Sequence, residues 1–380
     1  MGAMTSHPKR QTVRTIGTLA AAGVLAIVLA ASSAGRALAG PRLAASQTAS
    51  FQSLGQMPGA AMGTVVSGIS GDGSTIAGYG NLCTTFAANG SCLSSSTVQA
   101  FRWTPAGGYQ LLGTPGSSDF FGAGAVSFDG SVIVGEHPQP NQFAAFRWTA
   151  ATGMRQLPMN IATAVTPGGA MVAGGDDWWK TTGQTGTFGP FPGNPDQTEA
   201  QGLAGTAQAP VAVGAAIKGS DFRGVTFHAF RWTPATGLQD LGLTTGDESI
   251  AIAISGDANV IVGEARDASG FWRAFRWTAS TGIVDIGTLG GPESAAVATN
   301  KDGSVIVGSS LTSGSTGSSV PFRWTAKTGM QALTKLVNAP QRLIVQSAIG
   351  VSADGTVITG NGFNTKLGVD EPWRAVLPLP

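Results

Sequence analysis

Phe101-Arg102-Trp103-Thr104 is the first of five identical tetrapeptides in this chain of 380 residues. The other copies begin at Phe146, Phe230, Phe275 and Phe322. Upstream of each copy lies an apolar run that ends in glycine. With two weaker copies, these run-ending glycines are Gly78, Gly135, Gly174, Gly214, Gly263, Gly308 and Gly360. The spacing indicates seven units of about 47 residues each.

Each unit is predicted to contain four short antiparallel strands. A small apolar strand leads to an Asp-Gly turn such as Asp129-Gly130, and a β-branched run follows at residues 132–134. Asp and Gly tolerate the positive φ of a tight turn. The tetrapeptide forms the third strand, and the Gly-x-x-x-Leu-Gly pattern of residues 237–242 forms the fourth. We therefore predict an all-β fold, a β-propeller of about seven four-stranded blades, with a right-handed β-solenoid as the alternative.

The Phe and Trp of the tetrapeptide lie two residues apart, so both point to one face of the strand. A sheet with bulky aromatic residues on one face cannot bury that face alone, but identical neighbours in a ring can cover it. We therefore expect the aromatic residues of the repeat to be structural. They are Phe101, Trp103, Phe146, Trp148, Phe230, Trp232, Phe275, Trp277, Phe322 and Trp324.

The two ends of the repeat region complement each other. The last unit has an aromatic strand at residues 373–377, but no Gly-x-x-x-Leu-Gly strand follows it. A segment with the fourth-strand pattern lies instead at residues 51–55, before the first complete unit. We expect the two segments to pair and close the ring, because closure removes exposed sheet edges.

The repeat resembles the HAF family of extracellular repeats, named for a His-Ala-Phe tripeptide. The resemblance covers roughly residues 50–380, and the tripeptide itself is present at His228-Ala229-Phe230. At the other copies Gln99, Ala144, Arg273 or Val320 takes the place of the histidine. The resemblance implies an exported, β-rich protein, and it implies no catalytic residue.

Composition narrows the class of protein. Gly accounts for 56 residues, which argues against a helical repeat because Gly destabilises helices. The 17 Phe and 9 Trp argue against a disordered chain. Four basic and no acidic residues precede position 40, so the remaining chain has a net charge of −3. Without a basic stripe, we expect no nucleic-acid partner.

The first 39 residues are predicted to be a signal peptide. Lys9, Arg10 and Arg14 precede an uncharged stretch at residues 15–35, and Ala37-Leu38-Ala39 fits a signal-peptidase site. An uncleaved membrane anchor is the alternative. Residues 40–48 would be a linker and residues 49–380 a single repeat domain. We expect a secreted or periplasmic monomer that meets a membrane only if the signal is retained.

Cys83 and Cys92 lie nine positions apart in a segment rich in Ser, Thr, Ala, Gly and Asn. In an oxidising compartment such a pair is expected to form a disulfide. A metal site would need further ligands, and no histidine or third cysteine lies nearby. We predict no metal and no cofactor.

Two charged positions recur with the repeat. Arg102, Arg147, Arg231, Arg276, Arg323 and Arg374 occupy one of them. These arginines could bind an anionic glycan, but we expect them to pack between blades and meet a carboxylate or an aromatic ring. Asp72, Asp129, Asp257, Asp302 and Asp354 occupy the other. We expect these aspartates to shape turns, because one acidic residue per turn is too few for calcium.

Enzymatic motifs are sparse. Only His137 and His228 remain after signal removal, and we expect His228 to make a structural hydrogen bond. Nucleophile-elbow, His-Glu-x-x-His and Walker sequences do not occur.

The third unit departs from the repeat, which marks either decay or a specialised loop. Asp176-Asp177-Trp178-Trp179 stands where the tetrapeptide is expected, and Phe188 and Phe191 follow. These six residues are our candidates for binding a sugar at the ring mouth. The alternative is that Trp178 or Phe188 replaces missing core aromatics.

We therefore expect a non-enzymatic binding or scaffold module of the HAF type, whose partner is a glycan or another component of the cell envelope. The competing class is a secreted glycoside hydrolase or lyase on the same ring. An enzyme should hold carboxylates or histidines with perturbed pKa values around one mouth, whereas a binding protein should hold mainly aromatic and amide groups.

Overall fold

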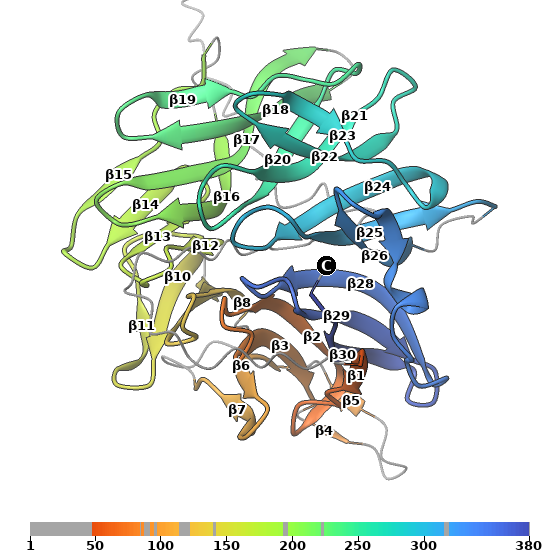
Figure 1. The fold of residues 1–380 in the computed structure, drawn as a ribbon. Coiled ribbons are helices and arrows are strands. Elements are labelled where there is room, and N and C mark those ends of the chain that lie inside the picture. The colour runs from red at the N-terminus through yellow and green to blue at the C-terminus, as the bar shows by residue number, and fades with distance from the viewer. Residues whose placement is uncertain are drawn as a thin grey trace, which may run out of the picture.

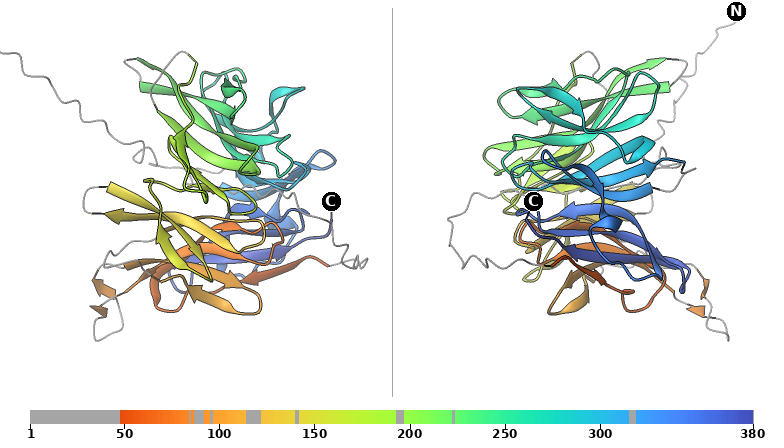
Figure 2. Two further views of the ribbon diagram at one scale, coloured as in Figure 1. Left: turned by 90° about the vertical axis from the view of Figure 1, so that its left-hand side faces the viewer. Right: turned by 45° about the vertical axis from the view of Figure 1, so that its right-hand side comes forward.

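The computed structural model describes residues 48–379 except 84, 87–91, 95–96, 114–121, 140–141, 193–196, 222–223 and 315–318. In this part of the chain, seven antiparallel sheets of four strands stand around a common axis (Figure 1). Neighbouring sheets contact each other around the full circle, and the side views in Figure 2 show them packed against one another. The fold is therefore the predicted seven-bladed β-propeller.

The blades follow the order of the chain. Blade 1 consists of β2 (Ala60–Ile69), β3 (Ile76–Leu82), β6 (Thr97–Thr104) and β7 (Gly108–Leu111). Blade 2 consists of β8 (Gly122–Val126), β9 (Val132–Gln139), β10 (Gln142–Thr149) and β11 (Gly153–Gln156). Blade 3 consists of β12 (Ala164–Val165), β13 (Met171–Gly174), β14 (Asp177–Lys180) and β15 (Thr185–Thr187). Blade 4 consists of β16 (Thr198–Gly205), β17 (Pro210–Asp221), β18 (Gly224–Thr233) and β19 (Gly237–Asp240).

Blade 5 consists of β20 (Ser249–Ile254), β21 (Ile261–Arg266), β22 (Trp272–Thr278) and β23 (Gly282–Asp285). Blade 6 consists of β24 (Gly290–Thr299), β25 (Ile306–Thr312), β26 (Ser319–Thr325) and β27 (Gly329–Ala332), and a 3-10 turn, η2 (Leu333–Lys335), follows it. Blade 7 consists of β28 (Leu343–Val351), β29 (Val357–Asn364), β30 (Val369–Val376) and the N-terminal strand β1 (Ser50–Ser53). A small hairpin of β4 (Thr85–Phe86) and β5 (Cys92–Ser94) projects from blade 1.

The ring is closed by strands from both ends of the repeat region. Phe51 pairs with Ala375 and Ser53 with Trp373, as expected, and the rings of Phe51 and Trp373 stack with their centroids 5.6 Å apart. Because of this pairing, β1 in red lies beside β30 in blue in Figure 1. β2 of blade 1 also packs against blade 7, which completes the circle.

The run-ending glycine of each blade is required by packing. Phe146 lies opposite Gly135 in the register of β10 and β9. A Cβ atom at Gly135 would lie 2.0 Å from the Gly122 carbonyl oxygen and 2.8 Å from the Phe146 ring. The carbonyl approaches because β8 carries a β-bulge between Ala123 and Ala125. Gly78, Gly263, Gly308 and Gly360 have the same two kinds of neighbour.

Each blade packs its arginine face onto the aromatic face of the next blade. Val262 and Ala274 of blade 5 share a buried cluster with Ile306 and Phe322 of blade 6. Arg147 donates from Nε to the Gly169 carbonyl oxygen of blade 3 at 3.3 Å. Burial lowers the pKa of Arg147, Arg231, Arg323 and Arg374. Arg147 and Arg323 are therefore interblade residues, although their partners are backbone carbonyls rather than the expected carboxylates or aromatics, and Arg102 donates to Thr75 of its own blade.

The repeated aspartates shape turns, as predicted. Asp129 Oδ1 accepts hydrogen bonds from Ser127 Oγ at 2.8 Å and from the Ser131 amide at 2.9 Å. Ser127 Oγ in turn accepts a hydrogen bond from the Val132 amide at 2.9 Å. Burial alone would raise the pKa of Asp129, but these hydrogen bonds outweigh it and lower the pKa. Asp257, Asp302 and Asp354 show the same balance.

Backbone hydrogen bonds also join the turns of neighbouring blades. The Ala353 amide of blade 7 donates to the Gly71 carbonyl of blade 1, and the Asp72 amide donates to the Phe128 carbonyl of blade 2. The Phe128 amide then donates to the Pro167 carbonyl of blade 3. Blades 5, 6 and 7 are linked in the same way through Lys301. One end of the ring is thus held by a chain of main-chain bonds.

Several predictions for the N-terminal half fall outside the described residues. The signal peptide and most of the linker belong to residues 1–47, so both remain predictions. The side chain of Cys92 is also outside the description, so the Cys83–Cys92 disulfide remains a prediction, although Cys92 is brought into the hairpin by its pairing with Phe86. Among the described residues, no helix has the length and apolarity needed to cross a membrane.

Gly308→Ala is expected to destabilise the protein. Its Cβ would lie 2.0 Å from the Ala295 carbonyl oxygen, and overpacking of this kind costs about 1–3 kcal/mol. Gly168→Ala is the matched control, because nothing lies within 4 Å of its added Cβ. Equilibrium unfolding in urea measures both free energies. Equal stability of the two variants would contradict the packing argument.

Deleting residues 49–56 removes β1 and is expected to lower the melting temperature by roughly 5 °C or more, because β30 loses its partner strand. Deletion of the preceding residues 40–47 serves as the control. Differential scanning calorimetry measures both. An unchanged melting temperature after the first deletion would show that strand closure contributes nothing.

Candidate functional site

The two ends of the propeller differ in construction. The uniform end carries the Asp turns between first and second strands and the turns between third and fourth strands. The latter repeat a Thr–Thr hydroxyl contact, for example Thr149 to Thr152 at 2.7 Å. The other end, which we call the variable end, carries the loops between second and third strands and the connections between blades. Because its loops vary, the variable end is the place to look for a site.

Carboxyl groups gather toward the variable end. Glu136 follows the run-ending glycine of blade 2 on β9, and Glu199 is the second residue of β16, the first strand of blade 4. Asp177 begins β14 in the intervening blade 3, and Asp176 immediately precedes that strand. These four residues form the acidic cluster. Its members come from three consecutive blades, so the ring rather than the local sequence brings them together.

Burial and mutual repulsion raise the pKa values of three of the four residues in the acidic cluster. Burial raises the pKa of Glu136, and repulsion from Glu199 raises it further. Burial and repulsion from Asp176 raise the pKa of Glu199, against a hydrogen bond from Gln201 Nε2 at 3.0 Å that lowers it. Burial and Asp176 also raise the pKa of Asp177. Among the described residues no Lys or Arg forms an ion pair with any of the four.

A second acidic pair lies between blades 5 and 6. Glu264 follows the run-ending glycine of β21, as Glu136 follows that of β9. Burial, together with repulsion from Glu293 of β24, raises the pKa of Glu264 to about 7, and Arg266 opposes the rise. Burial likewise raises the pKa of Tyr79, the equivalent residue of blade 1, with added repulsion from Asp370 and Glu136.

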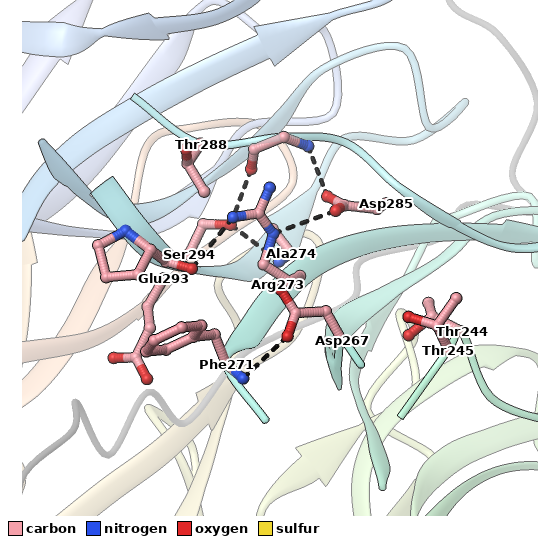
Figure 3. A network of polar contacts seen from close by, with 12 residues as sticks. Thr244, Thr245, Asp267, Phe271, Arg273, Ala274, Asp285, Thr288, Glu293 and Ser294 are labelled. Atoms are coloured by element: carbon pink, nitrogen blue, oxygen red, sulfur yellow. Dashed lines mark hydrogen bonds and ion pairs between the residues drawn. The ribbon is translucent and has the colours of Figure 1, made fainter. Parts of the chain in front are cut away.

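Several basic side chains near the variable end have carboxylate partners elsewhere. Arg266 Nε lies 2.5 Å from Glu248 Oε2, and its guanidinium lies over the Trp272 ring. Arg273 Nε lies 3.1 Å from Asp285 Oδ2, and its Nη1 donates to the Pro292 carbonyl at 3.0 Å (Figure 3). Lys218 contacts Asp240 at 3.4 Å. These basic side chains therefore form ion pairs with carboxylates outside the acidic cluster.

His228 is the structural histidine that the sequence predicted. Its Nδ1 lies 2.9 Å from Asp240 Oδ2 on the neighbouring strand β19. Arg273 and Asp285 occupy the same two positions in blade 5. The described residues contain no group of three or more His, Cys, Asp or Glu side chains placed to hold a metal ion.

Phe188 and Phe191 lie in the core, which corrects their assignment as binding residues. They are only 3 % and 2 % exposed. Phe188 meets Trp232 edge to face with the ring centroids 5.1 Å apart, and Phe191 packs near His228. The segment after β15 thus supplies aromatic rings to the interface with blade 4, as the alternative interpretation expected.

Trp178 and Trp179 do not form a joint stacking platform, because neighbouring strand residues point to opposite faces. Trp178 packs toward blade 4, donates from Nε1 to the Thr187 carbonyl at 3.1 Å and covers Gly186. Trp179 takes the place of the repeat tryptophan and packs toward blade 2. Asp176 accepts a hydrogen bond from the Thr198 amide at 2.9 Å, which ties blade 3 to blade 4. Of the six predicted site residues, only Asp176 and Asp177 belong to the acidic cluster.

Sequence reasoning missed Glu136, Glu199, Glu264 and Glu293. A weak signal existed at the residue after each run-ending glycine. It reads Tyr79, Glu136, Gly175, Ala215, Glu264, Ser309 and Asn361. Only two of these are charged, and in blade 7 Asn361 uses its amide to pair with the Val66 backbone of blade 1. The side chain at this position therefore faces the next blade. A carboxylate there is unfavourable, because the interface between blades removes it from water.

No family model and no curated protein matches the chain. Solved structures with the propeller fold do match. The β-propeller domain of the Trilobed protease from Pyrococcus furiosus, described as having an open velcro topology, is 9% identical with a TM-score of 0.54, over 83% of this chain and 94% of that one. An oligogalacturonate lyase from Vibrio parahaemolyticus is 10% identical with a TM-score of 0.54, over 87% of this chain and 98% of that one. At these identities the likeness shows the fold alone.

Stability should fall as pH rises through the range in which Glu264 ionises. Its pKa is about 7 in the folded state against 4.5 as the ordinary value, so the folded state holds the extra proton in this window. The contribution is fully present below pH 4.5 and is lost above pH 7. Glu264→Gln stays neutral throughout. The stability of the wild type relative to Glu264→Gln should therefore drop by about 2–3 kcal/mol.

Urea unfolding of both proteins at several pH values between these limits measures the difference, and the shared contributions of other groups cancel. Parallel pH profiles for the two proteins would show that Glu264 is not a buried, proton-holding carboxyl group.

Proposed function

We propose that this protein is an exported, non-enzymatic binding module of the HAF extracellular repeat type whose ligand engages the variable end. Export is supported by the basic, then apolar, first 39 residues and by the resemblance of the repeat. A disulfide between Cys83 and Cys92 belongs to the same proposal. The repeated residues of the uniform end are used in turns and interblade bonds, which leaves the variable end for recognition.

The acidic cluster is the observation that carries the proposal. Carboxylates that are half-buried, lack cationic partners among the described residues and raise each other's pKa cost stability. Sites retained at such a cost are characteristic of function. The cluster would accept hydrogen bonds from the hydroxyl groups of a neutral glycan or the amino groups of a cationic envelope component. A polyanionic ligand would be repelled.

A hydrolase is the second candidate, and the raised pKa values of Glu136, Glu199 and Glu264 favour it. A general acid in glycoside hydrolysis must hold its proton near neutral pH, and it works with a second carboxylate. The acidic cluster offers both kinds of group. Turnover of a glycan, rather than its binding alone, would distinguish this candidate.

Glu136→Gln combined with Glu199→Gln should weaken ligand binding about tenfold or more, because charge-assisted hydrogen bonds to both carboxylates are lost. Asp302→Asn combined with Asp354→Asn makes the same charge change at the uniform end. The Asn oxygens can still accept the turn hydrogen bonds, and once circular dichroism shows that this variant folds, its affinity should be unchanged. An array of neutral and amino-substituted glycans, followed by calorimetry on the hits, measures this. Loss of product formation instead of affinity would favour the hydrolase. Equal affinity of both double variants would refute the proposed site.

A further inference from the structure

Large apolar side chains are exposed around the variable end. On the hairpins between second and third strands, Phe143 of blade 2 is 45 % exposed, Phe271 of blade 5 is 42 % and Leu367 of blade 7 is 55 %. Val225 occupies a similar place on blade 4. Met62 and Ile344 are exposed near the starts of β2 and β28, at the same end. These residues lie on five different blades, so at this end of the ring most blades present an apolar group to a partner.

These apolar groups adjoin the acidic residues. Phe143 pairs with Pro138 in the register that also pairs Ala145 with Glu136, so Phe143 lies on the same face of blade 2 as Glu136, two residues farther out. Phe271 is two residues from Arg273 on the chain. Arg273 donates a hydrogen bond to the carbonyl of Pro292, the residue that precedes Glu293. Figure 3 shows Phe271 and Glu293 in this arrangement.

The negative charge of the variable end favours cationic partners over anionic ones. The acidic cluster and the pair of Glu264 and Glu293 lie toward it, whereas Lys218, Arg266 and Arg273 already have carboxylate partners. Three other basic residues are described there: Lys335 in the connection between blades 6 and 7, and Arg342 and Lys366 in blade 7. An anionic membrane surface or a polyanion would therefore be repelled across blades 2 to 5.

We propose that the variable end docks a polypeptide segment in which Lys or Arg side chains alternate with apolar ones. The basic groups would enter the acidic cluster, and the apolar groups would cover Phe143 and Phe271. A neutral glycan could use the carboxylates but would leave the aliphatic Leu367, Val225 and Ile344 without a partner. This inference rests on the proposed binding function and names the class of ligand.

Fluorescence anisotropy of the full chain with a labelled peptide of alternating Lys and Leu provides the direct test. The peptide should bind, and its affinity should fall as salt is raised, because part of the attraction is between charges. A Glu–Leu peptide tests the charge, and a Lys–Ser peptide tests the apolar contribution. Both should bind at least tenfold more weakly than the Lys–Leu peptide.

Two surface variants separate the contributions. Glu136→Gln with Glu199→Gln should weaken the Lys–Leu peptide about tenfold and should reduce its salt dependence. Phe143→Ser with Phe271→Ser should weaken it comparably without changing the salt dependence. Val284→Ser is the matched control, because Val284 is equally exposed at 47 % but lies on the outer strand β23. Circular dichroism confirms that each variant folds.

The outcomes distinguish this inference from the proposed function. If a neutral glycan binds at the acidic cluster and the Lys–Leu peptide does not, the docking inference is wrong and the binding function stands. If the peptide binds equally to wild type and both surface variants, its attachment is non-specific and the inference is also wrong. If neither ligand binds a folded protein, both proposals fail.

Discussion

An aromatic ring over a residue without a Cβ atom is the contact on which this propeller depends. In the full repeats, the bulged first strand pushes a carbonyl oxygen toward the run-ending glycine, and the Phe ring of the third strand covers the same glycine. The contact fixes the register of three strands at once. Ring geometry follows from repeating this one arrangement.

The repeat explains why the loops at the two ends of the molecule tolerate changes of sequence and length to different degrees. At the uniform end, the Asp turns and the hydrogen bonds between blades use the same few groups in nearly every unit. Changes there would disturb several blades. At the variable end, hairpins differ in length and sequence without affecting the aromatic contact. Buried like charges are tolerated at Glu136, Glu199 and Glu264 because the framework that holds them is determined elsewhere.

Features with a local cause could be predicted from the sequence. The number of blades, the pairing of Phe51 with the Trp373 strand, the Asp turns and the hydrogen bond of His228 each follow from a repeated pattern. The acidic cluster has no such pattern. Glu136 and Glu199 are 63 positions apart in the sequence, and the ring places them near enough for Glu199 to raise the pKa of Glu136. Their raised pKa values arise from burial, which no spacing in the chain reveals.

Blade 3 shows why a break in the repeat misled sequence reasoning about the site. Trp178 and Trp179 appear adjacent in the sequence, yet strand alternation sends them into two different interfaces. Trp179 fills the position of the repeat tryptophan, and Phe188 and Phe191 supply further core rings from outside the strand. The blade thus keeps its packing with different residues. What it gives up is a basic side chain at the arginine position, which Trp178 occupies. In blade 2 the repeat arginine reaches the uniform end, where Arg147 donates to the Gly169 carbonyl, so it does not offset the burial that raises the pKa of Glu136. The break in the repeat therefore changes how blade 3 packs, while the raised pKa values at the variable end come from burial and from neighbouring carboxylates.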